Sequence, residues 1–436
     1  MQGSEQYKFH LARYGHPSKF GFKDIIPTWH ADAFDPDYLV GLYKKAGAKY
    51  FVSMGVHHDN FDLRNFKHTR WNSVKMGPKR DIVAEFRNAA RKHGLPVGVS
   101  DHLWISYKWF AVSHLSDKEG PLAAVPYDGV NPENADLYHS YNGPELLTDK
   151  LEWDESGIPE SWKARWSLRI RDLIEQAEPD YLYSDGQLPF GQRGLEMAAY
   201  LYNRSAARHG GRTQAVYLSK RAADCAIGTC VLDHERGVID EIAAKPWQAD
   251  ICIGNWHYYR GIQYKSPKFI IDMLLDVVSR NGNLMLNFPL PKSGMLDQQE
   301  LQILEEITQL TQVNGEGIYA ARPWKISGAS PPPQIAPTAE ANFNEKDRKE
   351  LTADDVRFTT KGKVLYAFVM GIPAEKALIA HLASNGAHNV KKISHVEHLG
   401  FSGKVAWVQD DAGLHVQLPN RKPCKHALAF KVHDAI

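Results

Sequence analysis

The sequence predicts a (β/α)8-like (TIM) barrel over residues 1–325, a linker over 326–355 and an antiparallel β-sandwich over 356–436. The chain has 436 residues, enough for a barrel of roughly 250 residues and a second domain. Helix-like and strand-like segments alternate from about residue 35 to 315, which is typical of a parallel sheet covered by helices. After Trp324 the composition changes, first to prolines and then to short β segments.

The helices of the barrel are predicted from apolar residues at helical spacing and from end signals. Asp35 is a suitable N-cap, Pro36 fits the first helical position, and Gly47 ends that helix. The same reasoning predicts further helices over 81–93, 160–177, 194–209, 267–279 and 297–313.

The strands of the barrel are predicted from short apolar runs. The run 50–56 is almost continuously apolar, as expected for a strand buried on both faces of a parallel sheet. Further runs lie at 96–100, 181–184, 214–218, 229–232, 251–253 and 284–287. These are seven strands, and a closed barrel needs eight. The absent strand would precede residue 35, where 14–22 is predicted as a loop, so we expect the barrel to lack its first strand.

The segment after the barrel begins with prolines at 331–333 and 337, which predict a stiff, extended linker or surface loop. Five β segments follow, separated by turn residues such as Asn385-Gly386. They lie at 364–369, 377–380, 405–408, 414–418 and 427–432. A small antiparallel sandwich is therefore expected.

Composition argues against several classes of function. The 52 basic and 51 acidic residues leave a formal charge of +1, so neither nucleic acid nor an anionic membrane is an expected partner. No apolar run approaches the roughly 20 residues that span a bilayer, and the printed start has no signal-peptide pattern. The composition does not distinguish between cellular compartments or between a monomer and a homo-oligomer. The four cysteines, which form no C-x-x-C pair, are expected to be buried free thiols: Cys225, Cys230, Cys252 and Cys424.

The chemistry of a barrel is expected at the carboxyl ends of its strands. Carboxylates, imidazoles and aromatic residues gather in those positions of this sequence. They are His57, His58, Asp59, Asp101, His102, Asp185, Asp233, His234, Glu235, Asn255, Trp256 and Asn287. A sugar-cleaving site needs these residue types: two carboxylates for the reaction, polar groups for hydroxyls and aromatic faces for the ring.

A metal-dependent hydrolase is the main alternative, and the sequence argues against it. His57 and His58 are adjacent, and on a strand adjacent side chains point to opposite faces. This differs from H-E-x-x-H, in which both ligands share one face of a helix. No second histidine cluster is an obvious partner, so neither a metal nor another cofactor is expected.

Asp185 is the strongest single candidate for catalysis, because it ends an apolar strand and precedes a glycine that permits a sharp turn. A turn or N-cap aspartate is the structural alternative. The second carboxylate is open among Asp233, Glu235 and Glu241, and any of them could equally be a solvated surface charge.

Several of these segments resemble the α-L-fucosidases of glycoside hydrolase family 29. The likeness is carried by the histidine pair in 47–61, Trp71-Asn72, 77–81, the strand ending at Asp185-Gly186, and 276–287 with its Asn-Gly-Asn. It runs in the right order from about residue 30 to 320, and the family also carries a C-terminal β domain.

The resemblance implies a retaining hydrolase of terminal α-L-fucosyl linkages on fucosylated oligosaccharides or glycoconjugates. Asp185 would be the nucleophile, and Glu235, in its Glu-Arg-Gly setting, the acid/base. The expected substrate-binding residues are His57, His58, Trp71, Tyr183 and Trp256.

Three departures from the family pattern keep alternatives open. Gln248 stands where many members have a glutamate, Arg64 stands where many have an aromatic residue, and no His-Trp-Gly segment precedes residue 35. The last departure coincides with the absent strand and leads us to expect a chain that begins after it. The alternatives are a weak or inactive fucose-binding relative, and a retaining glycosidase for another sugar.

Overall fold

The computed structural model describes residues 2–139, 155–226, 228–329 and 343–436. The chain divides into two compact units, which we describe separately. The first unit comprises Met1–Gly41, Lys49–Val231 and Lys292–Met295, and the second comprises Leu42–Ala48, Leu232–Pro291 and Leu296–Ile436.

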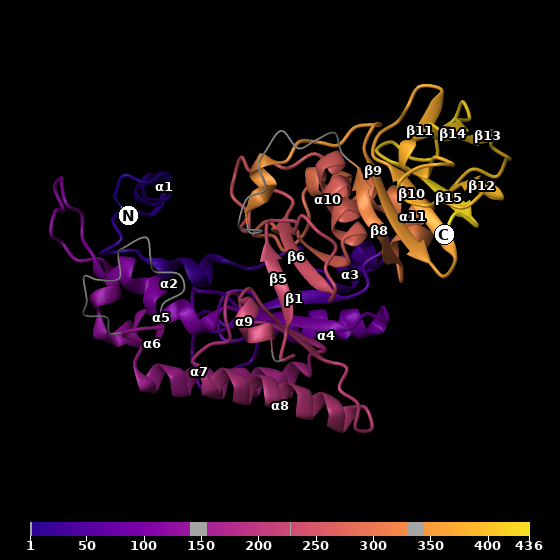
Figure 1. The fold of residues 1–436 in the computed structure, drawn as a ribbon. Helices are drawn as coiled ribbons and strands as arrows, with labels where there is room; N and C mark the ends of the chain where they lie inside the picture. Colours follow the sequence, from indigo (N-terminus) through magenta and orange to yellow (C-terminus); the bar gives the residue numbers. More distant parts are fainter. Residues whose placement is uncertain (1, 140–154, 227, 330–342) are drawn as a thin grey trace. The chain divides into compact units, whose positions relative to one another are not determined.

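Seven strands, β1 to β7, follow one another in the sheet in chain order. Among them, β1, β5 and β6 are labelled in Figure 1. Parallel ladders join β1 to β4 in the first unit and β5 to β7 in the second. Their bounds are Phe51–Val56, Val97–Asp101, Tyr181–Tyr183, Val216–Ser219, Val231–Glu235, Trp247–Cys252 and Gly282–Asn287. The barrel-type fold, one strand short of eight, is therefore confirmed for the described residues. Before β1 these residues form helices only.

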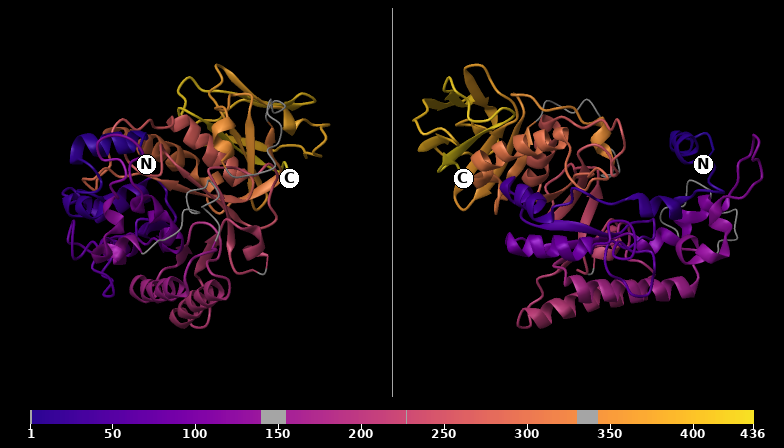
Figure 2. Two further views of the ribbon diagram at one scale, coloured as in Figure 1. Left: turned by 90° about the vertical axis from the view of Figure 1, so that its left-hand side faces the viewer. Right: turned by 180° about the vertical axis from the view of Figure 1, so that it is seen from behind.

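The first unit is built on its long helices. α7 (Glu160–Ala177) buries Trp166, Ile170 and Ile174 in one apolar cluster with residues of β2, β3 and α8 (Gln192–Arg208). α7 and α8 contact each other, and the left view of Figure 2 shows them side by side. The other α-helices of this unit are α1 (Glu5–Tyr14), α2 (Phe22–Ile25), α4 (Ile82–Lys92), α5 (Ser106–Trp109), α6 (Ala135–Tyr138) and α9 (Ala222–Cys225), while α3 (Pro36–Lys45) spans the division between the units.

The second unit holds two helices that begin at strong caps. The Ser266 hydroxyl accepts the Phe269 N–H at the start of α10 (Pro267–Ser279). Asp297 and Glu300 form a capping box at the start of α11 (Gln298–Ile318). α11 runs five residues beyond its predicted end, and a Cβ at Gly317 would come within 2.8 Å of the Tyr366 ring. The glycine therefore permits a close packing contact and does not end the helix.

Two antiparallel sheets complete the second unit and confirm the predicted sandwich. Five strands pair in the order β12-β15-β10-β9-β8, and three in the order β11-β14-β13. Their bounds in chain order from β8 are Arg322–Ala329, Val356–Lys361, Val364–Val369, Lys376–Ile379, His395–His398, Trp407–Asp410, Gly413–Gln417 and Leu428–His433. Both sheets contribute to one apolar core, which includes Phe358, Ile379 and Phe430.

β8 begins before the predicted linker and extends into it. It pairs antiparallel with β9, and the Trp324 ring centroid lies 5.0 Å from that of Phe358 in the core of the sandwich. Polar residues such as Arg322 and Lys325 interrupt the apolar residues of this strand, so it does not stand out as an apolar run in the sequence. The proline cluster at 331–333 lies outside the described residues.

The prediction of four free thiols is wrong for two of them. Cys225 and Cys230 form a disulfide, with Cα atoms 4.7 Å apart, across the turn between α9 and β5. A C-x4-C spacing is no recognised motif, so only the turn geometry brings the two sulfurs together. Cys252 and Cys424 are buried free thiols, as expected.

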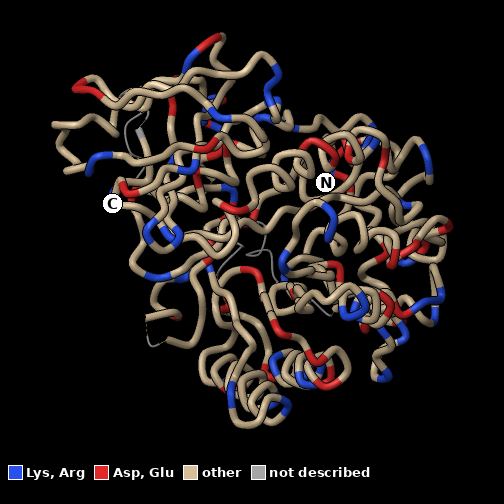
Figure 3. The backbone as a smooth tube through the Cα atoms, turned by 90° about the vertical axis from the view of Figure 1, so that its right-hand side faces the viewer, with Lys and Arg blue, Asp and Glu red and all other residues tan. Residues whose placement is uncertain are grey.

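Charges of both signs are interspersed along the chain, as the red and blue segments of Figure 3 show. This distribution agrees with the formal charge of +1. No helix among the described residues combines the length and the apolar character needed to cross a bilayer.

Candidate active site

Asp185 lies directly after β3, where the chain turns sharply. Its φ is 51° and that of Gly186 is 98°, so both residues adopt the left-handed region. Oδ1 of Asp185 lies 2.5 Å from Nζ of Lys220 and 3.2 Å from the Tyr183 hydroxyl. Oδ2 lies 3.2 Å from Nδ1 of His102 and 3.4 Å from Nε2 of His58. The side chain is 17% exposed, so cationic and polar groups surround a carboxylate that remains reachable.

The surroundings of Asp185 keep it ionised. Burial alone would raise its pKa, but the Lys220 ammonium and the imidazoles of His102 and His58 hold the pKa well below its usual range. Burial lowers the pKa of His102, an effect that the charge of Asp185 opposes. A carboxylate that stays charged is the form required of a nucleophile.

Three imidazoles lie together beside this carboxylate. The ring centroids of His57 and His58 are 4.4 Å apart, and that of His102 is 4.6 Å from His57 and 5.1 Å from His58. The Trp109 ring lies 4.5 Å from His58 and is half exposed. The expectation that His57 and His58 point to opposite faces is wrong, because β1 ends at Val56 and the pair lies in the turn beyond it.

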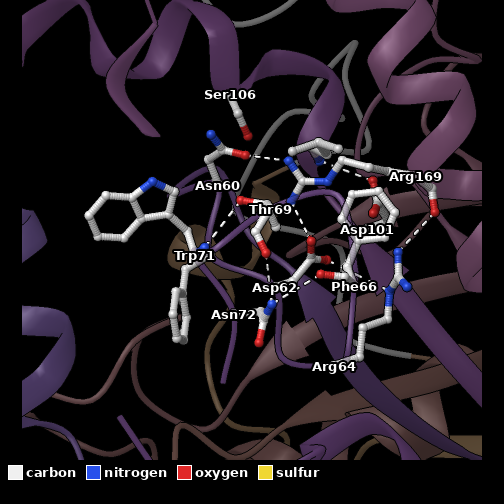
Figure 4. Close-up of polar contacts among 12 residues, drawn as sticks. Asn60, Asp62, Arg64, Phe66, Thr69, Trp71, Asn72, Asp101, Ser106 and Arg169 are labelled. Carbon is white, nitrogen blue, oxygen red and sulfur yellow. Dashed lines mark hydrogen bonds and ion pairs between the residues drawn. The ribbon is translucent and has the colours of Figure 1, made fainter. Parts of the chain in front are cut away.

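A buried polar network supports the loop that carries the histidine pair. In Figure 4, Arg169 of α7 lies between Asn60 and Asp62. Its guanidinium donates to Oδ2 of Asp62 at 2.7 Å, and Arg169 and Asp62 are 1% and 0% exposed. Arg64 donates to the Arg169 carbonyl and pairs with Asp172. The departure at Arg64 thus joins this loop to α7, and its side chain is buried.

The three candidates for the second carboxylate lie in the second unit and differ in exposure and in hydrogen-bond partners. Glu235 is partly exposed at the end of β5 and accepts the indole N–H of Trp256 at 3.1 Å. Asp233 is fully buried and accepts the Gln248 amide at 2.7 Å, so the departure at Gln248 has a structural partner. Glu241 is exposed in the following loop. Glu235 best combines access with a fixed position.

Of the predicted substrate-binding residues, the structure groups His58 and Tyr183 directly with Asp185, and His57 packs on His58. Trp256 contacts Glu235 in the second unit. Trp71 is 5% exposed and packs in a separate apolar cluster with Phe61 and Leu137. The prediction omitted Lys220, although it follows β4 directly and the strand-end rule applies to it as well.

A parallel (β/α) sheet with a charged nucleophile candidate, imidazoles and indoles at its strand ends defines a barrel-type glycoside hydrolase. Residues 1–316 match the family "Alpha-L-fucosidase", and residues 348–433 match "Alpha-L-fucosidase C-terminal domain". The chain belongs to the α-L-fucosidase family.

Individual relatives agree with this placement. The chain is 26% identical over 432 residues to the tissue alpha-L-fucosidase of Homo sapiens, covering 97% of this chain and 78% of the human protein. The Rattus norvegicus protein of the same name is 25% identical over 433 residues, which are 97% of this chain and 79% of the rat protein. The Thermotoga maritima alpha-fucosidase, solved with a mechanism-based inhibitor, superposes with a TM-score of 0.70 at 21% identity, over 99% of this chain and 86% of the Thermotoga chain. An alpha-L-fucosidase from Bacteroides thetaiotaomicron superposes with a TM-score of 0.66 at 16% identity, over 100% of this chain and 88% of the Bacteroides chain. At such identities the two structures show the shared fold.

Proposed function

We propose that this glycoside hydrolase cleaves terminal α-L-fucosyl linkages with retention of configuration, through a glycosyl ester at Asp185. The observation that carries the proposal is the setting of Asp185, a partly exposed carboxylate that Lys220 and two imidazoles keep ionised. A charged carboxylate at a strand end, in a fucosidase-family chain, is suited to attack an anomeric carbon.

The reaction has two balanced steps. An oxygen of Asp185 forms a bond to the anomeric carbon as the bond to the leaving oxygen breaks, and Glu235 gives that oxygen its proton. Water then attacks the same carbon and loses a proton to Glu235, and the ester bond to Asp185 breaks. Two displacements at one carbon restore the original configuration.

Binding of the sugar is assigned to the groups beside these carboxylates. The ring nitrogens of His57 and His58 suit sugar hydroxyls, and Tyr183 orients Oδ1 of Asp185. The Trp256 indole fixes Glu235 and offers an aromatic face. Trp71, expected as a sugar contact, is buried, so we assign it a packing role behind the loop of the histidine pair. A fucosylated oligosaccharide or glycoconjugate is the substrate class.

Hydrolysis of an aryl α-L-fucoside tests the nucleophile. Asp185→Asn is expected to reduce kcat by at least about 1,000-fold, whereas Asp354→Asn, at an exposed aspartate of the second unit, leaves it unchanged. Proton NMR of the first sugar released should show the α anomer. Full activity of Asp185→Asn, or release of the β anomer, contradicts the proposal.

The acid/base assignment has its own test. Glu235→Ala should slow a substrate with a poor leaving group far more than an activated aryl fucoside, and added azide should restore part of the rate. Glu241→Ala is the matched control, because that glutamate is exposed. Azide rescue of Glu241→Ala alone would move the assignment to Glu241.

The two alternative functions predict different results. A binding relative would bind L-fucose in calorimetry and turn over no fucoside. A glycosidase for another sugar would prefer another member of a panel of aryl glycosides.

A further inference from the structure

Two histidines direct their inner ring nitrogens at one carboxylate oxygen. Nε2 of His58 lies 3.4 Å and Nδ1 of His102 lies 3.2 Å from Oδ2 of Asp185. His57 adds a third imidazole, and one ring nitrogen from each of the three lies within 4.8 Å of the others. Three nitrogens and an oxygen thus converge in the first unit.

The outer nitrogens of the same two histidines are occupied. Nδ1 of His58 lies 3.1 Å from the His102 carbonyl, which can only accept, so this nitrogen carries a proton. In the neutral imidazole that binds a metal ion, Nε2 then presents the lone pair. Nε2 of His102 lies 2.7 Å from the Ser100 hydroxyl. An outer ring nitrogen bonded to a carbonyl or another oxygen is the support that metal-binding histidines usually have.

Nδ1 of His102 gives a separate indication of a ligand. His102 is 8% exposed, and its Nδ1 is shielded from solvent without a hydrogen-bond partner in the described part of the chain. Oδ2 of Asp185 lies 3.2 Å from this nitrogen as a possible ion-pair partner. A buried polar atom without a hydrogen bond is costly, and a bound ion at this nitrogen would remove that cost.

The spacing fits a small divalent ion. Zinc binds imidazole nitrogen and carboxylate oxygen at about 2.0–2.1 Å, which in a tetrahedron places neighbouring ligand atoms about 3.3–3.4 Å apart. The two distances to Oδ2 match this edge. Lys220 and Tyr183 contact Oδ1, so Asp185 has Oδ2 available as a single ligand.

We propose that His58 Nε2, His102 Nδ1 and Asp185 Oδ2, with His57 beside them, form a binding site for a divalent transition ion of the zinc class. Imidazole and carboxylate ligands favour zinc, cobalt, nickel or copper over magnesium or calcium. The ion is an inhibitor, because it occupies the oxygen and the imidazoles that the sugar needs. This inhibition, but not the binding, rests on the proposed function of Asp185.

Cobalt tests the binding without any assay of activity. The full chain, freed of metal with EDTA, is titrated with Co²⁺ and followed by visible absorption. Wild type should show a saturable one-to-one spectrum of the intense tetrahedral type, which Zn²⁺ abolishes. His102→Ala should lose this spectrum, Ser100→Ala should weaken the affinity about 10- to 100-fold, and His395→Ala, at an exposed histidine beside His433, should keep both. No saturable spectrum, or an unchanged one in His102→Ala, overturns the site.

Steady-state kinetics test the inhibition. Zn²⁺ should raise the KM of an aryl α-L-fucoside without lowering kcat, and Ser100→Ala should raise the inhibition constant by the factor measured for cobalt. Because Ser100→Ala keeps all the ligands, it also guards against a misfolded His102 variant. Cobalt binding without this competition overturns the inhibitory role and leaves the site itself in place.

Discussion

The ammonium nitrogen of Lys220 lies 2.5 Å from Oδ1 of Asp185, joining the residues that follow β3 and β4. A second link lies close by, since the Lys220 N–H donates to the Gly186 carbonyl at 2.7 Å. The same lysine therefore fixes the turn that carries the nucleophile candidate and supplies its counter-charge.

Lys220→Ala should lower kcat/KM about 10- to 100-fold, because the carboxylate loses its nearest positive charge. The pKa of Asp185 lies well below its usual range, so removing Lys220 raises it and moves the acid limb of the pH–rate profile to higher pH. Lys220→Arg keeps the positive charge, so this variant should retain most of the activity, and the acid limb of its pH–rate profile should stay at the wild-type pH. An acid limb that stays in place in Lys220→Ala would show that this lysine does not control the nucleophile.

Arg169→Met should destabilise the protein by about 3–5 kcal/mol, because the buried carboxylate of Asp62 loses its hydrogen-bonded partner and keeps only the longer ion pair with Arg64 at 3.7 Å. Urea unfolding followed by circular dichroism measures this loss. Arg171→Met is the matched control on the same helix, since Arg171 is exposed and stacks on Tyr200. Equal losses of unfolding free energy in both variants would mean that the buried network contributes no more to stability than the exposed arginine does.

Asp101 should make stability depend on pH. Burial raises its pKa to about 7, against 3.8 when unburied. A raised carboxyl pKa contributes stability that is complete below about pH 4 and is lost as the pH rises through 7. Asp101→Asn should therefore raise Tm relative to wild type at pH 8 and have little effect at pH 4. A Tm difference that is the same at both values would contradict the shift.

The disulfide closes a loop of six residues, Cys225 to Cys230. Chain entropy assigns such a loop about 2 kcal/mol of stability. The double variant Cys225→Ser/Cys230→Ser should lose this amount in chemical unfolding, and dithiothreitol should lower the Tm of wild type but not that of the variant. Cys252→Ser, at a free thiol, controls for the loss of a cysteine and should respond to dithiothreitol as wild type does.

Where local signals are strong, prediction and structure agree to the residue. α7 at 160–177, α10 at 267–279 and β10 at 364–369 have the predicted bounds. An amphipathic face, a cap and Pro267, or an unbroken apolar run mark these elements within the segment itself. The count of seven barrel strands was accessible for the same reason.

Two strands of the second unit were shifted in the prediction. β5 lies at 231–235 and β6 at 247–252, against predicted runs of 229–232 and 251–253. Asp233 and Gln248 are buried and bonded to each other inside these strands. A search for apolar runs misses buried polar residues of this kind, because a hydrogen bond to a residue on another strand makes their burial possible.

The sequence by itself determined the fold class, the order of its elements and the residue types at the strand ends, because each depends on periodicity and on neighbours along the chain. Only the tertiary structure decided that Lys220 pairs with Asp185, that His102 joins the histidine pair, that Arg64 and Trp71 are buried, and that Cys225 bonds Cys230. These relationships depend on where turns place side chains in space, which spacing along the chain does not encode.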